Sequence, residues 1–243
     1  MLLTSLPLRM GAPNDRRWII LAVFALIAVV VVGAILISRS GSDDDGNSTA
    51  TATASKNGCK EVEAPAPKKV SLKAPEQTIE AGEEQTAVVE TSCGTFKIEL
   101  DTKQAPITTN SFAYLAEEGF YDGLDFHRIV PEFVIQGGDP LGNGTGGAGY
   151  SVDEKPPSNL EYTKGVVAMA KSSTDPPGRS SSQFYVVTGP DAGLPPEYAL
   201  VGKVSEGLDV VEKIGKLAKP NTEEPKQTIL IESVTIEPGR PGS

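Results

Sequence analysis

Three side chains capable of chemistry lie close together in residues 126–149 of the chain, FHRIVPEFVIQGGDPLGNGTGGAG. Arg128 supplies a cation, Phe133 an aromatic face and Gln136 an amide. The first half of this stretch is rich in β-branched and aromatic residues and is interrupted by Pro131, so it predicts two short strands about a bend. Alternation along such strands brings the three side chains near one another. They would form an apolar pocket with two polar groups aimed into it, a common design for a ligand site.

The second half of the stretch is rich in glycine and predicts a loop that turns tightly or approaches a ligand closely. Residues 142–147 formally fit the G-x-G-x-x-G pattern of dinucleotide sites. That pattern binds a dinucleotide between a strand and a helix, with an acidic residue about 20 positions further on. Pro156 and Pro157 follow instead and exclude such a helix. We therefore interpret this segment as a loop at the rim of the pocket.

The overall composition excludes several other kinds of site. The chain of 243 residues has a formal net charge of −10 and a pI of about 4.7. An acidic chain without a basic patch is not expected to bind nucleic acid. One histidine and two cysteines are too few for a zinc site built from these ligands. No G-x-S-x-G elbow accompanies the histidine, so a Ser-His-Asp hydrolase is not expected either.

The N-terminus predicts a membrane anchor. Residues 1–17 contain three arginines, and residues 18–37 form an uncharged apolar run. At about 1.5 Å per residue, a helix of this length crosses the ~30 Å hydrocarbon core of a bilayer. The positive-inside rule places residues 1–17 in the cytoplasm and the rest of the chain outside it, at the cell membrane. The alternative is a cleaved signal peptide, which would have a shorter apolar core and an A-x-A cleavage site.

Residues 38–83 contain few aromatic residues and many Ser, Thr, Ala, Pro, Lys and Glu. A segment of this composition buries too little apolar surface to fold alone, so it predicts a flexible extracytoplasmic linker. The folded domain is expected over residues 84–238, and residues 239–243 are expected to be a short tail.

Hydrophobic patterns in this domain predict many short strands and two isolated helices. The helices are expected over residues 108–118, capped by Thr108 or Thr109, and over residues 207–217. A hairpin is expected at residues 91–94. Many short strands with two helices indicate a mainly β fold, a closed antiparallel barrel with the helices over its ends. The strands are expected over residues 87–90, 95–100, 126–129, 133–136, 166–170, 184–188, 200–204 and 228–236.

Residues 126–149 closely resemble a signature motif of the cyclophilins, the cyclosporin-binding class of peptidyl-prolyl cis-trans isomerases. Residues 165–188 (GVVAMAKSSTDPPGRSSSQFYVVT) resemble the family's second signature at Met169, Ala170 and residues 182–185. The resemblance covers about residues 84–238 and implies a barrel of eight strands with two capping helices. It also implies an enzyme that needs no metal or cofactor. With its apolar N-terminal segment, the chain resembles a membrane-anchored bacterial member of the family.

The resemblance implies roles for individual residues. Arg128 matches the family's catalytic arginine. The family's substrate groove falls on Phe133, Val134, Gln136, Ala170, Gln183, Tyr185, Leu194 and Tyr198. We add His127 and Lys171 to the substrate-binding set, and we expect His127 to pack and hydrogen-bond locally rather than to act as a base. Some positions depart from the family: Val134 replaces the usual Met, Tyr185 a typical Phe, Tyr198 a His, and Gly193 the Trp of the best-known members. The missing Trp argues against tight binding of cyclosporin.

Cys59 and Cys93 both lie outside the cytoplasm in the predicted topology. An oxidising compartment permits a disulfide bond between them, and this bond would staple the linker to the first hairpin of the domain. Closing a loop of about 34 residues would stabilise the fold by roughly 3–4 kcal/mol in the chain-entropy model. The alternative is two free thiols, and we favour the disulfide.

The predicted function is cis-trans isomerisation of X-Pro bonds in extracytoplasmic proline-containing polypeptides, which would make the protein a folding catalyst. One alternative is a membrane-tethered chaperone or scaffold that binds peptides without catalysis. Another is an envelope protein whose barrel serves as a spacer. The presence of Arg128 argues against the first alternative. The combination of Phe133, Gln136 and Gln183 argues against the second.

Overall fold

The computed structural model describes residues 57–239. The predicted cytoplasmic segment, the predicted membrane span, residues 38–56 of the predicted linker and residues 240–243 of the tail lie outside the described residues. Within residues 57–239, no helix is long and apolar enough to cross a membrane.

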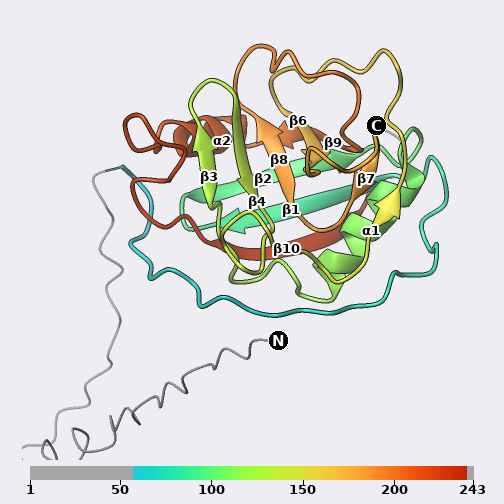
Figure 1. The fold of residues 1–243 in the computed structure, drawn as a ribbon, viewed down its shortest axis with the longest axis horizontal. Coiled ribbons are helices and arrows are strands. Elements are labelled where there is room, and N and C mark those ends of the chain that lie inside the picture. Colours follow the sequence, from blue (N-terminus) through green and yellow to red (C-terminus); the bar gives the residue numbers. More distant parts are fainter. Residues whose placement is uncertain (1–56, 240–243) are drawn as a thin grey trace, which may run out of the picture. The chain divides into compact units, whose positions relative to one another are not determined.

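The described residues form one curled antiparallel sheet of eight strands with a helix at each end (Figure 1). The sheet has the order β10-β1-β2-β9-β6-β8-β4-β3, and β5 pairs with β7 in a separate ribbon. A mainly β fold with two helices is therefore confirmed. The strands are β1 (Gln85–Thr91), β2 (Gly94–Leu100), β3 (Arg128–Val130), β4 (Val134–Gly137), β5 (Val152–Asp153), β6 (Val166–Met169), β7 (Arg179–Ser180), β8 (Phe184–Val187), β9 (Leu200–Glu206) and β10 (Ile231–Pro238), and the helices are α1 (Pro106–Glu117) and α2 (Leu208–Gly215).

The sheet is an open half-barrel, so the predicted closed barrel is wrong in this respect. Its two edge strands are β10 and β3. Residues 123–126, just before β3, are joined to residues 229–231 by three backbone hydrogen bonds of 2.7–3.0 Å, but this contact does not continue as a ladder between β3 and β10. The physical reason lies in β3, which has three residues. The N–H of its middle residue, Ile129, donates to the carbonyl of the loop residue Glu223 at 2.8 Å, so it does not pair with β10.

Helix α1 begins two residues earlier than predicted, and neither Thr108 nor Thr109 caps it. Its N-cap is Ala105, which offers no side-chain hydrogen bond, and Pro106 occupies the first turn. The carboxylate of Glu154 instead accepts hydrogen bonds from the backbone N–H groups of residues 107 and 108, at 3.1 and 2.7 Å. A carboxylate at this position satisfies N–H groups that the start of a helix leaves free, and it complements the helix dipole.

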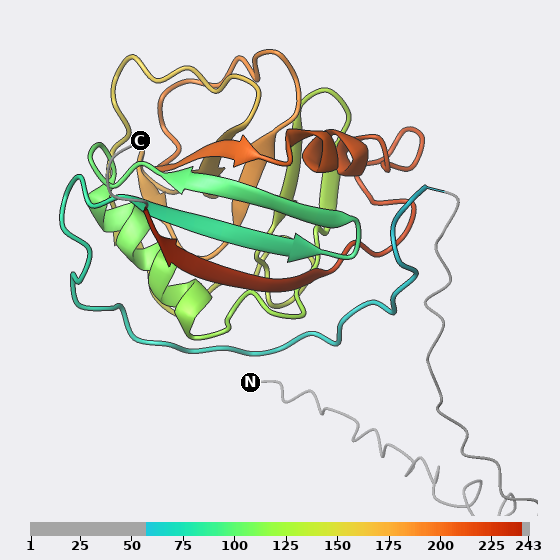
Figure 2. The ribbon, with the colours of Figure 1, turned by 180° about the vertical axis from the view of Figure 1, so that it is seen from behind.

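The inside of the half-barrel is filled by a large apolar cluster, here called the inner cluster. The two helices close it at opposite ends of the sheet (Figure 1, Figure 2). Phe184 of β8 lies in this cluster, and its ring packs edge-on against the rings of Phe112 and Tyr121, each at 5.5 Å between centroids. The helices contribute the buried stripes that the sequence predicts: Phe112, Leu115 and Ala116 from α1, and Val211, Ile214 and Leu217 from α2 and the residues just after it.

Residues 57–83, which the sequence predicts to be part of a flexible linker, lie along the domain instead. We call this segment the strap. It runs beneath β10 and α1 in both views of the ribbon (Figure 1, Figure 2). Its apolar residues Val70, Leu72 and Ile79 pack against the inner cluster. The average composition of residues 38–83 gives no sign of these few spaced apolar contacts. The strap is ordered by packing against the domain and not by a core of its own.

Polar contacts hold the strap at intervals along its length. Cys59 forms a disulfide bond with Cys93, in the turn between β1 and β2. Backbone N–H groups of residues 60, 68 and 72 donate to carbonyls of the domain at 2.7–2.8 Å. At the far end, the side chain of Asn110 accepts hydrogen bonds from the N–H groups of residues 78 and 79, at 2.8 and 3.0 Å, and donates to the carbonyl of Glu76 at 3.0 Å.

Candidate active site

Arg128 and Gln136 face each other across the pair of strands β3 and β4, as the alternation in the sequence predicts. The two residues are register partners. The Nη1 of Arg128 donates a hydrogen bond of 3.1 Å to the Oε1 of Gln136. The side chain of Arg128 is 31% exposed, so one part of the guanidinium is held by the protein and another part faces solvent.

Gln136 continues into a chain of amide hydrogen bonds. Its Nε2 donates to the Oε1 of Gln183 at 2.9 Å, and the Nε2 of Gln183 donates to the carbonyl of Gly146 at 2.9 Å. Each glutamine amide therefore accepts a hydrogen bond through its oxygen and donates one through its nitrogen, so every donor in this series faces an acceptor. The structure thus brings together Arg128, Gln136 and Gln183, three of the residues that the sequence predicts for the site.

The glycine-rich loop rims this polar chain. Buried Asp139 shapes the loop, because its carboxylate accepts hydrogen bonds from the backbone N–H groups of residues 141, 143 and 144 at 2.5–3.0 Å. Gly146 packs so closely on Asp139 that an added Cβ would collide with the carboxylate. The absence of a side chain at Gly146 therefore lets its carbonyl reach Gln183, which supports the interpretation of the segment as a rim rather than a nucleotide loop.

Most of the apolar residues predicted for the groove belong to a second cluster on the opposite face of β4 and β8 from the inner cluster. We call it the outer cluster. Its buried members are Ala105, Val134, Tyr162, Val166, Ala168, Tyr185, Val187 and Leu200, and its partly exposed members are Phe133, Leu160, Ala170, Ala192, Leu194 and Tyr198. The predicted residues Phe133, Val134, Ala170, Tyr185, Leu194 and Tyr198 are all included.

Three tyrosine rings stiffen the outer cluster. Tyr162, Tyr185 and Tyr198 pack on one another with centroid separations of 5.7–6.3 Å. The hydroxyl of Tyr162 donates to the carbonyl of Tyr198 at 2.7 Å and accepts from its N–H at 2.9 Å. Burial raises the pKa of Tyr162 to about 12. The sequence analysis missed this residue, because a single tyrosine in a polar stretch carries no signal of its own.

Lys171 lies beside the outer cluster. Its side chain is 6% exposed, its Nζ lies 5.5 Å from the centroid of the Tyr198 ring, and it pairs with Glu197 at 3.5 Å. The ammonium therefore lies against Tyr198 and Glu197, and we interpret Lys171 as a support for this part of the outer cluster.

His127 lies next to Arg128 but lines a separate polar cavity of about 410 Å³, with Asp125 and Gln227 among its other lining residues. Both ring nitrogens are buried without a hydrogen-bond partner among the described residues. Burial lowers the pKa of His127, a shift that Asp139 opposes and Arg128 reinforces. The expected local hydrogen bonds of His127 are thus absent from the described part of the chain, and its ring favours the neutral form.

Glu223 is a residue of the site that sequence reasoning missed. Its carboxylate accepts hydrogen bonds from both the Nε and the Nη2 of Arg128, at 2.6 and 3.1 Å. The guanidinium in turn lowers the pKa of Glu223. No local pattern could have revealed the contact, because the two residues are 95 positions apart in the sequence.

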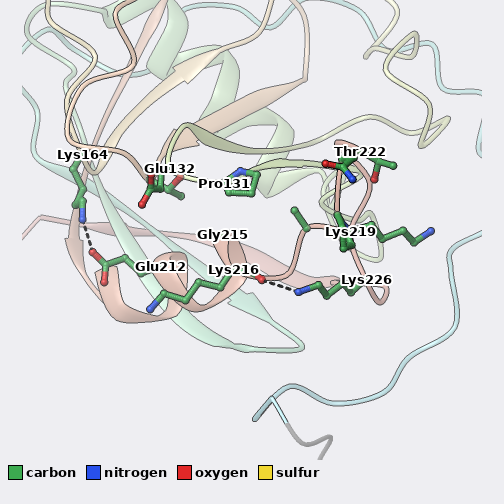
Figure 3. Close-up of a pocket in the computed structure, with 13 residues that line it drawn as sticks. Pro131, Glu132, Lys164, Glu212, Gly215, Lys216, Lys219, Thr222 and Lys226 are labelled. Atoms are coloured by element: carbon green, nitrogen blue, oxygen red, sulfur yellow. Dashed lines mark hydrogen bonds and ion pairs between the residues drawn. The ribbon is translucent and has the colours of Figure 1, made fainter.

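A cavity of about 830 Å³ is lined by residues other than those predicted for the groove (Figure 3). It is bounded by Pro131 and Glu132 at the turn before β4, by the end of α2, and by the loop that follows α2. None of the residues predicted for the site lines it. Within residues 57–239, no group of three or more His, Cys, Asp or Glu side chains is placed to hold a metal ion.

Comparisons with known proteins find similar sequences. Residues 86–236 match the family model described as "Cyclophilin type peptidyl-prolyl cis-trans isomerase/CLD". The chain is 39% identical over 147 residues to peptidyl-prolyl cis-trans isomerase ppi1 of Schizosaccharomyces pombe, which covers 59% of this chain and 93% of the relative. It is 37% identical over 147 residues to peptidyl-prolyl cis-trans isomerase-like 1 of Homo sapiens, covering 59% of this chain and 87% of the relative.

Solved structures give the same result. The fold is similar to a cyclophilin type peptidyl-prolyl cis-trans isomerase of Cryptosporidium parvum, with a TM-score of 0.60 and 28% identity, covering 65% of this chain and 99% of that one. A second structure of the same protein was solved in the presence of the dipeptide Ala-Pro. It matches with a TM-score of 0.59 and 29% identity, covering 63% of this chain and 99% of that one.

Proposed function

This chain belongs to the cyclophilin-type family of peptidyl-prolyl cis-trans isomerases, and we propose that it rotates X-Pro bonds where Arg128 borders the outer cluster. The observation that carries the proposal is the hydrogen-bonded chain from Arg128 through Gln136 and Gln183 to Gly146. This series of hydrogen bonds lies along one edge of the outer cluster, which is a partly open apolar surface. A proline ring needs such a surface, and its flanking peptide bonds need such donors.

The reaction has a high barrier without making or breaking a covalent bond. Twisting the X-Pro bond breaks amide resonance and costs about 18–20 kcal/mol. At the twisted transition state the imide nitrogen regains a lone pair, which the planar ground state does not offer. A hydrogen bond from Arg128 to that lone pair is therefore stronger in the transition state, which is the condition for catalysis.

Arg128 retains donors for this task. A guanidinium carries five N–H groups, and the contacts with Glu223 and Gln136 use three of them. One charge-assisted hydrogen bond contributes about 1.5–3 kcal/mol, which corresponds to roughly 10–150-fold in rate. The remaining acceleration is assigned to the outer cluster, where Phe133, Val134 and Leu194 would hold the proline ring in a poorly hydrated pocket that favours the less polar twisted state.

The substrate would be a proline-containing polypeptide. The relative solved in the presence of Ala-Pro supports this substrate class. We further propose that residues 18–37 anchor the chain in the cell membrane with the isomerase domain outside the cytoplasm. The Cys59–Cys93 disulfide supports this location, because disulfides persist in oxidising compartments. Protease added to sealed cells or spheroplasts should remove the domain, whereas its full protection would contradict the proposed topology.

The proposed reaction is tested by measuring cis-trans exchange of a proline tetrapeptide by NMR, with the wild type and with Arg128→Ala. Exchange catalysed by the wild type should fall at least tenfold in the variant. Arg179→Ala is the matched control, because Arg179 forms a similar two-bond pair with Asp153, at 2.8 and 2.9 Å, on strands outside the site. Equal activity of Arg128→Ala and wild type would overturn the role of Arg128.

A second candidate function is peptide binding without catalysis, on the same outer cluster. The same experiment separates the two. A folded wild-type domain that binds the tetrapeptide but does not accelerate its exchange would favour the binding module.

A further inference from the structure

The contact between Glu223 and Arg128 is made twice, once by side chains and once by the backbone. The carboxylate takes the Nε and Nη2 edge of the guanidinium at 2.6 and 3.1 Å. The carbonyl of Glu223 accepts from the N–H of Ile129, the residue after Arg128, at 2.8 Å. The backbone contact therefore joins Glu223 to the strand that carries the arginine and holds its carboxylate beside the guanidinium.

The loop that carries Glu223, residues 217–226, is itself braced. Ala218 and Pro225 form a bridge, and Lys226 N–H donates to the carbonyl of Leu217 at 2.6 Å. The N–H of Lys219 also donates to the backbone carbonyl of Glu224 at 2.7 Å. The loop borders the cavity of about 830 Å³, where Thr222 and Lys219 can be seen (Figure 3). A braced loop presents the Glu223 carboxylate in one place.

The two contacts of the guanidinium leave a defined part of it free. Glu223 occupies the N–H of Nε and one N–H of Nη2, and Gln136 occupies one N–H of Nη1. One N–H on each Nη nitrogen remains. With Gln136 alone, a single hydrogen bond would hold the group, and the guanidinium plane could rotate. The second anchor at Glu223 fixes the plane and therefore the direction of the two remaining donors.

We propose that Glu223 is a positioning residue for the isomerisation, which acts by fixing the guanidinium plane of Arg128. The inference rests on the proposed role of Arg128. We assign Glu223 no contact with the substrate; both of its carboxylate oxygens accept hydrogen bonds from Arg128. Its contribution is realised in the transition state, where the direction of the donor matters, and not in the binding of the planar peptide.

The test compares Glu223→Ala and Glu223→Gln with Glu224→Gln in the full domain with its strap. Glu224 is the matched control, because it lies on the same loop and pairs with Lys219 instead of Arg128. Glu223→Ala should lower kcat about fivefold, the size expected for losing one exposed ion pair, and should leave KM nearly unchanged. Glu223→Gln, which keeps one acceptor oxygen, should recover part of the loss, and Glu224→Gln should match the wild type.

The double variant Arg128→Ala/Glu223→Ala decides whether Glu223 acts through the arginine. It should be no less active than Arg128→Ala alone, because nothing remains to be positioned. The ¹⁵Nε–¹H signal of Arg128 gives an independent readout: it should be observable in the wild type and lost through fast solvent exchange in Glu223→Ala.

Three results would overturn the inference. Glu223→Ala with unchanged or raised kcat would show that the carboxylate does not assist the arginine or competes with its ligand. A further loss of activity on adding Glu223→Ala to Arg128→Ala would show an effect independent of the arginine. Full activity of Arg128→Ala alone would remove the proposed role of the arginine, on which the inference rests, and this outcome is distinguishable because it needs no change at Glu223.

Discussion

Strands β4 and β8 present two apolar clusters on their opposite faces, and the two clusters differ in what covers them. One face contributes Ile135, Phe184 and Val186 to the inner cluster, and the other contributes Val134, Tyr185 and Val187 to the outer cluster. These strand residues are almost equally buried, with exposures of 0–4%. Among the described residues, both clusters have partly exposed members, but the inner cluster has eight of them beside 32 buried residues and continues into helices α1 and α2, whereas the outer cluster has six beside eight.

This difference shows that residue type alone does not separate the proposed binding face from a core. Valines and aromatic rings occur on both faces of the same strands. What distinguishes the outer face is an incomplete cover, together with the Arg128 chain along its edge. Close packing gives stability on the inner face. On the outer face, a partly open surface can accept a proline ring from a substrate.

The largest effect is expected for Phe184→Ala. The ring is fully buried and packs edge-on against three other rings of the inner cluster. Its removal should lower the free energy of unfolding by about 3–5 kcal/mol, because the cavity cannot collapse completely. Urea unfolding measures this change. Phe133→Ala is the matched change in the outer cluster. Because this ring is partly exposed, its removal should lower the free energy of unfolding less and the activity more. Equal losses of stability would contradict the distinction between the clusters.

A finer comparison uses two neighbouring valines on β8. Val186 faces the inner cluster and Val187 the outer one, and both are 0% exposed. Val186→Ala should lower the free energy of unfolding by about 2 kcal/mol and leave catalysis unchanged. Val187→Ala should cost less stability, because the partly open cluster can relax, and should lower kcat/KM. If Val187→Ala lost more stability in unfolding and Val186→Ala lost more catalysed exchange, our assignment of the two faces would be wrong.

A smaller effect is expected for Tyr185→Phe. The hydroxyl of Tyr185 is buried without a hydrogen-bond partner among the described residues, and burial raises the pKa of Tyr185 far above its ordinary range. Removing an unsatisfied hydroxyl should leave the free energy of unfolding unchanged or raise it by about 1 kcal/mol. Catalysed exchange should persist, since the ring remains. A marked loss of activity would give the hydroxyl a role in substrate contact.

The smallest effect is a dependence of stability on pH, arising from His127, the one histidine of the chain. Burial lowers its pKa in the folded state, so below the ordinary value of about 6.5 the unfolded chain binds more protons than the folded one. Stability should therefore decline as pH falls below about 6.5. The carboxylates whose pKa values are lowered by ion pairs, such as Glu223, act at lower pH. His127→Gln should remove the slope, and an unchanged slope in thermal unfolding would contradict this assignment.

Local patterns in the sequence predict much of this arrangement. Alternation about Pro131 correctly brings Arg128 opposite Gln136, because register in a short hairpin follows from the spacing of its residues. The hairpin at residues 91–94, both helices and the disulfide pair are also present. These features depend on residues close in sequence or on a single pair of side chains.

Features that depend on distant contacts could not be predicted in this way. The strap is too poor in apolar residues to fold alone, and it is ordered by surfaces built from residues such as Asn110. The cap of α1 comes from Glu154, and the second anchor of Arg128 from Glu223. The loop contact at Ile129 also leaves the half-barrel open at β3. In each case the partner lies on another element, which the sequence does not place.

The most direct test of the central claim is to locate the bound peptide by NMR titration of a proline tetrapeptide onto the ¹⁵N-labelled domain, residues 57–239. We expect the largest shifts at Gln136, Tyr185 and Leu194 and at the Nε of Arg128, with little change at Val186 or Phe184. Shifts concentrated instead at Lys216, Ala218 and Asn221 would place the peptide in the cavity of about 830 Å³ and would contradict the assignment of the outer cluster as the active site.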